Sequence, residues 1–189
     1  MSLTLASTSA IRRHMLDAAG VKYEPAAPDV DEDELRLGLS DSDQIALRLA
    51  SAKALSVPGE WVIGSDSVVS SAGRHFTKPS SRDDAAEHLR FFSGGLMKLT
   101  SAVALASGGR LDWSHVETAT LKVRELSESF ISDYLDAEWP EVGYTVGVFR
   151  LEGLGVQLFD RIDGDHFAIL GMPLVPLLVA LRERGLMAR

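Results

Sequence analysis

The sequence contains no cysteine, which excludes a disulfide framework and any metal site built on thiolates. It also lacks an apolar run near the roughly 20 residues that a membrane-spanning helix needs. The N-terminal segment has no long apolar stretch after a basic start, so it does not resemble a secretory signal. These absences lead us to expect a cytoplasmic protein with no membrane partner.

Basic residues are fewer than acidic ones: the sequence has 19 Lys and Arg and 27 Asp and Glu, which gives a formal net charge of −8. An acidic surface repels the phosphate backbone of nucleic acids, so we expect no nucleic-acid partner. An anionic small molecule remains compatible with this charge, because a cleft can hold a local positive field within an acidic protein.

Several common catalytic motifs are missing. The sequence has no GxxxxGK[ST], no HExxH and no GxSxG, which removes support for a P-loop protein, a metalloprotease or an esterase. Gly153 and Gly155 give two glycines of a dinucleotide fingerprint, but Leu158 stands at the third position. The five histidines are scattered without the spacing of metal ligands.

Hydrophobic periodicity predicts alternating strands and helices. Strands are expected at 3–6, 61–70, 98–106 and 118–123, and helices after Ser7 or Ser9 up to Gly20, at 41–55, from Ser81, at 127–137 and at 173–185. We interpret 25–34 as an acidic loop and 144–170 as short strands with tight turns. No repeat or linker interrupts the pattern, so we predict a single α/β domain over residues 1–189 with a central mixed sheet and flanking helices.

The first strand, its Ser/Thr turn and the following helix form a candidate phosphate site. The first N–H groups of a helix have no partner within it, and together with the helix dipole they attract phosphate. Arg12 and Arg13 lie one turn into this helix and add positive charge. The alternative is that both arginines lie on the solvent side of the helix.

Four other charged residues are candidates, and each has an ordinary structural alternative. Asp66 ends an apolar strand, where α/β proteins often position ligand-binding groups, although an Asp there also caps turns. Glu32 lies in the acidic loop, which is also typical of a solvated surface. Lys53 and Lys78 are equally compatible with exposed lysines. Taken one by one, none of these residues identifies a site.

Their order along the chain does. Nearly the whole sequence resembles the Maf family of nucleoside triphosphate pyrophosphatases. The segments that carry the resemblance are LASTSAIRR (Leu5–Arg13), VDEDE (Val30–Glu34), AKA (Ala52–Ala54), IGSDSVV (Ile63–Val69), KP (Lys78–Pro79), SGG (Ser93–Gly95), VGVFRLEGLG (Val146–Gly155) and RIDGDHFAILGMPL (Arg161–Leu174). So many segments in the same order make this resemblance far more specific than any single motif.

The resemblance implies an α/β fold similar to that of inosine triphosphatase, with two lobes around a cleft. It implies hydrolysis of a nucleoside triphosphate to the monophosphate and pyrophosphate, which removes non-standard nucleotides, and dependence on Mg²⁺ or another divalent cation such as Mn²⁺ or Co²⁺. A homodimer is expected from the family alone. The implied catalytic residues are Asp66, Lys78 and Arg13; the substrate-binding residues are Ser7, Ile11, Arg12, Lys53, Ser67 and Glu152; the metal ligands are Glu32 and Asp66.

These residue types suit attack of water on the α-phosphorus. Mg²⁺ prefers carboxylate, phosphate and water oxygens, and an ion held by Glu32 and Asp66 would activate a water and polarise the phosphate. Asp66 would also accept the proton of the water. The arginines and lysines would stabilise the charge that develops on the transferred and leaving groups.

Three positions bear on the base of the substrate. Family members acting on dTTP and UTP have Arg, Thr and Gln where this chain has Ile11, Ser67 and Glu152, whereas the 7-methyl-GTP branch has Glu at the last position. A carboxylate accepts hydrogen bonds from guanine N–H groups and repels the carbonyls of thymine or uracil. We therefore predict a purine or modified-purine substrate, although the Trp and Gln that the 7-methyl-GTP branch has at the first two positions are absent.

Three alternatives remain open from the residues alone. The first is a dTTP/UTP pyrophosphatase, and the second is a non-catalytic nucleotide-binding regulator of cell division. The third is a phosphatase that releases orthophosphate. Asp66 together with the cationic residues favours an enzyme, because a regulator has no need for the carboxylate.

Overall fold

A seven-stranded mixed sheet organises the computed structural model, which describes residues 1–188. The strands are β1 (Leu3–Ala6), β2 (Glu24–Ala26), β3 (Trp61–Ser71), β4 (Arg74–Phe76), β5 (Leu96–Ser107), β6 (Arg110–Val123) and β7 (Phe159–Asp163). The helices are α1 (Ala10–Ala18), α2 (Glu32–Arg36), α3 (Ser42–Ser56), α4 (Arg82–Phe92), α5 (Glu128–Glu138), α6 (His166–Ile169) and α7 (Leu174–Glu183), with 3₁₀ turns η1 (Glu141–Tyr144) and η2 (Leu154–Leu158).

The strand order is β2-β1-β3-β5-β6-β7, and β4 pairs with β3 outside this path. β1 is parallel to both β2 and β3, with Leu5 opposite Ile63, whereas β4 and β7 are antiparallel to their neighbours. This mixed sheet with its helices confirms the predicted α/β class. Because β1 and β3 are parallel with Ala6 opposite Gly64, Ser7 follows the end of β1 at the level of Ser65 and Asp66, which lie inside β3 and not at its end.

The chain divides into two compact units. Unit 1 comprises Met1–Ser67, Thr100–Thr118 and the C-terminal residues from Asp165, and unit 2 comprises Val68–Leu99 and Ala119–Gly164. The three long strands β3, β5 and β6 each contribute residues to both units.

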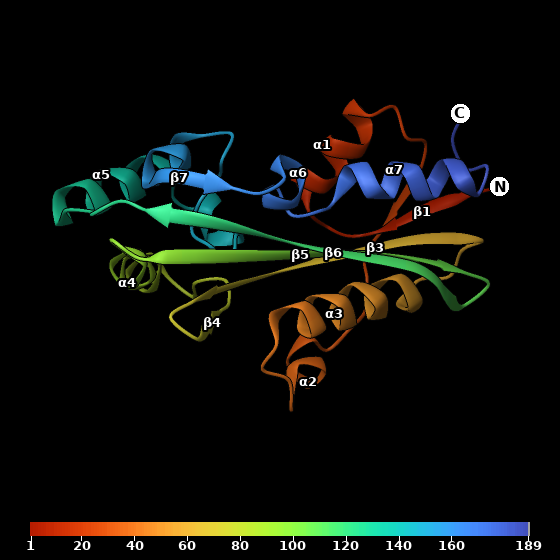
Figure 1. Ribbon diagram of the computed structural model, residues 1–189, viewed down its shortest axis with the longest axis horizontal. Coiled ribbons are helices and arrows are strands. Elements are labelled where there is room, and N and C mark those ends of the chain that lie inside the picture. The colour runs from red at the N-terminus through yellow and green to blue at the C-terminus, as the bar shows by residue number, and fades with distance from the viewer. Residues whose placement is uncertain (189) are drawn as a thin grey trace. The chain divides into compact units, whose positions relative to one another are not determined.

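Unit 1 has helices on both faces of its strands. Figure 1 shows α1, α6 and α7 on one side and α2 and α3 on the other. The first side encloses a core drawn from β1, β3, β5, α1 and α7, in which Leu5, Leu16, Ile63, Leu105 and Leu177 are fully buried. Each such side chain stabilises the fold by roughly 1.5–3 kcal/mol relative to an exposed position.

Side-chain caps fix where the helices begin. Ser9, Asp41, Ser81 and Ser127 each accept a hydrogen bond from the backbone N–H three residues later. Helices α1, α4 and α5 therefore begin next to serines at which the sequence predicted a helix start. Replacing such a cap with Ala typically costs about 1 kcal/mol.

Three segments differ from their predictions. Residues 25–34, expected as a loop, contain the end of β2 and the start of α2, because Asp31 accepts from the Glu34 N–H at 3.0 Å and starts a helical turn. β6 begins at Arg110 rather than at residue 118. The prediction missed the first half of this strand because that half is only partly buried and shows little apolar alternation. The 144–170 segment holds one strand, β7, and otherwise turns and short helices.

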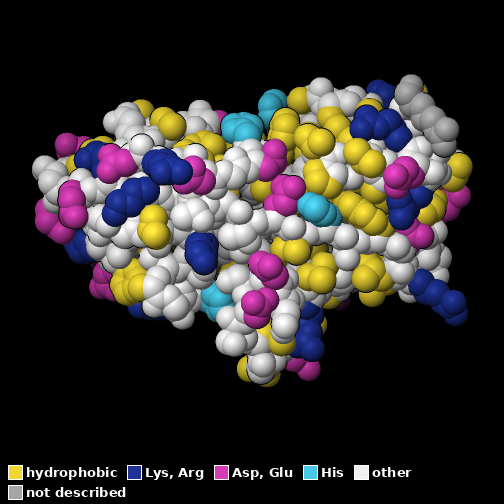
Figure 2. Space-filling view, in the orientation of Figure 1, with side chains coloured by type: hydrophobic (Ala, Val, Ile, Leu, Met, Phe, Trp, Pro, Cys, Tyr) yellow, Lys and Arg dark blue, Asp and Glu magenta, His cyan; other side chains and the backbone are white. Residues whose placement is uncertain are grey.

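Unit 2 packs α4 against α5, and ion pairs connect the two helices. Arg82 bonds Asp136 at 2.5 Å, and Arg90 bonds Glu128 at 2.8 Å. Acidic and basic side chains are interspersed over the face of the molecule that Figure 2 draws. None of the helices within residues 1–188 has the length and apolarity needed to cross a bilayer.

Candidate functional site

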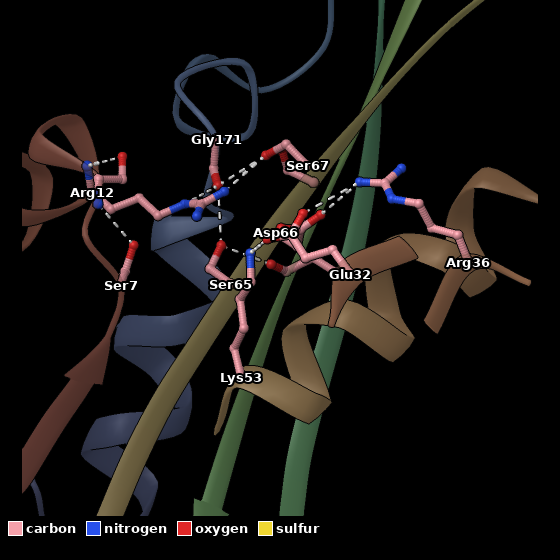
Figure 3. Close-up of polar contacts among 12 residues, drawn as sticks. Ser7, Arg12, Glu32, Arg36, Lys53, Ser65, Asp66, Ser67 and Gly171 are labelled. Carbon is pink, nitrogen blue, oxygen red and sulfur yellow. Dashed lines mark hydrogen bonds and ion pairs between the residues drawn. The ribbon is translucent and has the colours of Figure 1, made fainter. Parts of the chain in front are cut away.

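Strand β3 divides the polar residues of unit 1 between its two faces. Successive side chains of a strand point to opposite faces, so Ser65 and Ser67 lie on one face and Asp66 on the other. Figure 3 shows Asp66 directed toward α2 and α3, and Ser65 and Ser67 directed toward Gly171. Each face carries its own set of polar contacts.

On the α3 face, two acidic and two basic residues form what we call the carboxylate cluster: Glu32, Arg36, Lys53 and Asp66. The Lys53 Nζ lies 2.5 Å from Asp66 Oδ1 and 2.7 Å from Glu32 Oε1, so one ammonium bridges two carboxylates. Arg36 Nη2 lies 3.7 Å from Glu32 Oε2 and 4.0 Å from Asp66 Oδ2. The structure thus brings three predicted site residues, Glu32, Lys53 and Asp66, into direct contact.

The position of Lys53 follows from the close approach of α3 to β3. A Cβ on Gly64 would lie 2.1 Å from the Ala50 carbonyl oxygen and 2.4 Å from the Ala54 nitrogen, so only glycine fits there. Because Ala50 and Ala54 lie against the strand, Lys53, which is next to Ala54 in the helix, is also held close to β3 and is only 7% exposed. A charged lysine in such surroundings requires anionic partners, which Glu32 and Asp66 supply.

Asp66 is 5% exposed, and its two oxygens have different surroundings. Oδ1 accepts from Lys53, whereas Oδ2 is buried and accepts no hydrogen bond from residues 1–188. The Arg36 nitrogen at 4.0 Å is beyond hydrogen-bond distance. A buried carboxylate oxygen without a donor costs free energy, which marks Oδ2 as a position where a ligand would bind.

On the opposite face, five residues form what we call the serine cluster: Arg12, Ser65, Ser67, Ser101 and Gly171. The Gly171 carbonyl accepts from Arg12 Nε at 2.9 Å, Ser65 Oγ at 3.0 Å and Ser67 Oγ at 3.2 Å. Ser67 also accepts from Arg12 Nη2 at 3.2 Å and lies 2.8 Å from Ser101 Oγ. These bonds fasten the α6–α7 connection to β3 and α1.

Arg12 is half-buried, and its charge lies in the field of the carboxylate cluster. Burial lowers the pKa of the Arg12 guanidinium, and the carboxylates of Asp66 and Glu32 act in the opposite direction. A guanidinium still remains charged in proteins. The two predicted residues Arg12 and Ser67 are therefore in contact, although Arg12 is partly engaged in holding Gly171.

The turn that leads into α1 is built from its own serines. The Ser9 N–H donates to Ser7 Oγ at 3.2 Å, and Ser9 in turn caps α1. Ser7 is 5% exposed. This confirms the predicted strand, turn and helix, and it places the N-terminus of α1 next to the end of β1.

Besides Ser7, four predicted site residues lie outside both clusters. Ile11 is half-buried and Arg13 is exposed on α1, where the Arg13 carbonyl accepts from the Tyr23 hydroxyl at 3.4 Å. Lys78 and Glu152 belong to unit 2 and are both exposed. The Glu152 carboxylate lies 3.6 Å from Arg150 Nε.

Sequence reasoning missed Arg36, Ser65 and Gly171. Arg36 was detectable, because Glu32 and Arg36 stand four residues apart and would share a face if 32–36 were helical. Ser65 and Gly171 gave no comparable signal, since their roles depend on a contact 106 residues apart in the chain.

Comparison with known proteins identifies the family. Residues 2–184 match the family described as Maf-like protein. A nucleoside triphosphate pyrophosphatase of Nitrobacter hamburgensis is 46% identical over 98% of this chain and 95% of its own. A 7-methyl-GTP pyrophosphatase of Rhizobium meliloti is 44% identical over 97% of this chain and 96% of its own.

Among solved structures, a nucleoside-triphosphatase/dITP/XTP pyrophosphatase of Mycobacterium abscessus matches 98% of this chain and 96% of its own, with a TM-score of 0.43 and 15% identity. The family match covers both clusters of unit 1 as well as the whole of unit 2. The chain therefore belongs to the family of Maf-like proteins.

Proposed function

We propose that this chain is a hydrolase that cleaves a nucleoside triphosphate to the nucleoside monophosphate and pyrophosphate, and so removes non-standard nucleotides from the pool. Relatives named nucleoside triphosphate pyrophosphatase and 7-methyl-GTP pyrophosphatase support this activity. The observation that carries the proposal is the carboxylate cluster, in which a buried aspartate offers one oxygen without a hydrogen-bond donor. A cytoplasmic setting agrees with the lack of cysteine.

Asp66 is the proposed proton acceptor. Its Oδ2 accepts no hydrogen bond from residues 1–188, while Lys53 holds Oδ1 and fixes the orientation of the carboxylate. A carboxylate held in this way is suited to accept the proton of a water that attacks the α-phosphorus. A non-catalytic nucleotide-binding protein would gain nothing from such a group.

Cationic groups of unit 1 would neutralise the phosphate chain. Lys53 and Arg36 accompany the carboxylates, and Arg12 lies in the first turn of α1, where the helix dipole attracts phosphate. Arg13 and Lys78 are proposed to add charge on the leaving pyrophosphate. Such contacts accelerate reactions because they stabilise charge in the transition state.

A divalent cation fits the donors of the carboxylate cluster. Glu32 and Asp66 provide hard oxygen ligands, and the lone Asp66 Oδ2 is a buried acceptor without a donor. When bound, Mg²⁺ or a similar ion such as Mn²⁺ or Co²⁺ would supply Lewis-acid activation of the phosphate. Glu32 and Asp66 are the residues that would hold it.

Glu152 supports a purine or modified-purine base. Its exposed carboxylate accepts hydrogen bonds and would select a base edge rich in N–H donors. Arg150 Nε lies 3.6 Å from this carboxylate and forms an ion pair with it. Ile11 offers an apolar surface, and Ser67 stands where pyrimidine-specific relatives carry Thr.

The test is a panel of ordinary and modified nucleoside triphosphates, with separate assays for pyrophosphate and orthophosphate. We expect pyrophosphate and monophosphate in equal amounts, fastest with a purine, and no orthophosphate. Asp66→Asn serves as the inactive control. Tight binding without product would instead support a regulator, and orthophosphate release would support a phosphatase.

A further inference from the structure

The Lys53 ammonium lies between the two carboxylates that are suited to hold a metal ion. Its Nζ is 2.5 Å from Asp66 Oδ1 and 2.7 Å from Glu32 Oε1, and the side chain is almost fully buried. A divalent ion that bridges Asp66 Oδ1 and Glu32 Oε1 would need the same space and would be repelled by the ammonium. Figure 3 shows how Lys53 reaches from α3 to these two residues. Lys53 and a metal ion therefore compete for one position.

The carboxylate cluster alone supplies too few ligands for a metal ion. Residues 1–188 contain no group of three or more His, Cys, Asp or Glu arranged to hold one. Mg²⁺ requires about six oxygen ligands, so two carboxylates leave most positions to water or to phosphate. A triphosphate would supply the missing oxygens and would also give Lys53 a new anionic partner.

Arg36 would keep both carboxylates close to a cation if Lys53 moved away to a phosphate oxygen. Its Nη2 lies 3.7 Å from Glu32 Oε2 and 4.0 Å from Asp66 Oδ2, so it faces the second oxygen of each carboxylate and is farther from them than the Lys53 ammonium. Its side chain is 19% exposed, and it comes from α2, so movement of Lys53 on α3 does not displace it.

We propose that Lys53 is an internal competitor of the metal ion, so that the metal binds as Lys53 transfers from Glu32 and Asp66 to a phosphate oxygen of the substrate. The proposal rests on the triphosphate substrate proposed above. In the free protein Lys53 keeps the carboxylates paired, and metal affinity is low. Substrate and metal therefore bind with positive coupling, since each removes an obstacle to the other.

The test measures Mn²⁺ binding to the free protein by electron paramagnetic resonance, without nucleotide. We expect Lys53→Met to lower the Mn²⁺ dissociation constant at least about tenfold, because the competing charge is gone from the shared position. Arg36→Met is the matched control: it removes the same charge from the same cluster, but from 3.7–4.0 Å rather than 2.5–2.7 Å from the carboxylate oxygens, so its effect should be about threefold or less.

Lys53→Gln is the second variant, and it decides the result if Lys53→Met does not fold by circular dichroism. The gain in Mn²⁺ affinity should disappear when Glu32→Gln is added to either variant. Unchanged or weaker Mn²⁺ binding in the folded Lys53 variant would overturn the proposal, as would an equal gain in Arg36→Met. Because the test measures Mn²⁺ binding and no turnover, its result can be interpreted even if the chain has no hydrolase activity.

Discussion

Asp66 places its two carboxylate oxygens in different environments. Oδ1 accepts from Lys53 at 2.5 Å, and Oδ2 is buried without a hydrogen-bond donor from residues 1–188. The first contact orients the side chain, and the second oxygen is the proposed proton acceptor. The amide of asparagine keeps the shape of this group but removes its charge and basicity.

Asp66→Asn should therefore lower kcat by at least about a hundredfold, the range expected for loss of a general base. The fold should survive, because Glu32 still pairs with Lys53. Steady-state pyrophosphate release and thermal unfolding measure the two effects. Asp133→Asn, on an exposed position of α5, is the control. Turnover near the wild-type rate in Asp66→Asn would contradict the assignment.

Glu152 is the residue proposed to select the base. Glu152→Gln replaces a pure acceptor with a group that also donates, so the variant should tolerate the carbonyls of uracil and thymine. We expect the ratio of kcat/KM for UTP over GTP to rise by roughly tenfold, corresponding to about 1.4 kcal/mol. Competition assays with mixed triphosphates measure this ratio, and an unchanged ratio would refute the role of Glu152.

At the residue scale, sequence reasoning anticipated some contacts and not others. Glu32, Lys53 and Asp66 were expected in one site because of their order along the chain, and the structure joins them. The bridging position of Lys53 was not foreseeable, since it depends on the close packing of α3 on β3. The roles of Arg13 and Lys78 remain predictions.

At the scale of elements, the contact between α3 and β3 positions the carboxylate cluster. Gly64 lies where a Cβ would be 2.1 Å from the Ala50 carbonyl oxygen. The nearest atoms are all backbone atoms of α3 and cannot yield as a flexible side chain would, so a methyl group must push the helix away. Since Lys53 is carried by this helix, its distance to Asp66 depends on Gly64.

Gly64→Ala should destabilise the protein by about 1–3 kcal/mol and reduce pyrophosphate release, because α3 and Lys53 are displaced. Chemical denaturation and steady-state kinetics measure the two effects. Gly73→Ala is the matched control: it is strained by its φ of +77° but meets no atom within 4 Å. The control should lose stability without losing activity, and full activity in Gly64→Ala would argue against the packing role.

Helix α4 carries a buried histidine, His88, whose pKa is lowered by its surroundings. His88 packs edge-on against Phe76 at 5.1 Å, and its Nε2 lies 3.4 Å from Asp84. Burial lowers the pKa of His88 below 6.5; Asp84 and Glu87 raise it, and Arg74 lowers it. The folded state thus favours the neutral ring.

The unfolded chain consequently binds the proton more readily, and the His88 contribution to stability is lost as pH falls from about 6.5 through the folded pKa. His88→Gln should flatten the decrease in unfolding free energy between pH 7 and 5. Denaturation at several pH values measures this slope. His14→Gln, at an exposed position, should leave it unchanged; an unaltered slope in His88→Gln would contradict the assignment.

Most elements followed from hydrophobic periodicity and caps, because apolar alternation and Ser or Asp at the first turn are local signals. β1, α3, β3 and α7 lie within a few residues of their predicted bounds. The start of β6 and helix α2 were missed because both are rich in exposed polar residues, which lack such a pattern.

At the scale of the whole molecule, the mixed α/β sheet was predictable from alternating elements, and the family from the order of its motifs. The chain folds as two compact units that share three long strands. The description as one domain over residues 1–189 and the homodimer remain predictions. The joint action of Asp66 in unit 1 with Lys78 and Glu152 in unit 2 is also still a prediction.

The most direct test of the proposed reaction is hydrolysis of the preferred triphosphate in ¹⁸O-labelled water, followed by mass spectrometry of both products. If water attacks the α-phosphorus beside Asp66, one ¹⁸O atom enters the nucleoside monophosphate and none enters the pyrophosphate. Label in pyrophosphate, or labelled orthophosphate with a nucleoside diphosphate, would contradict the account.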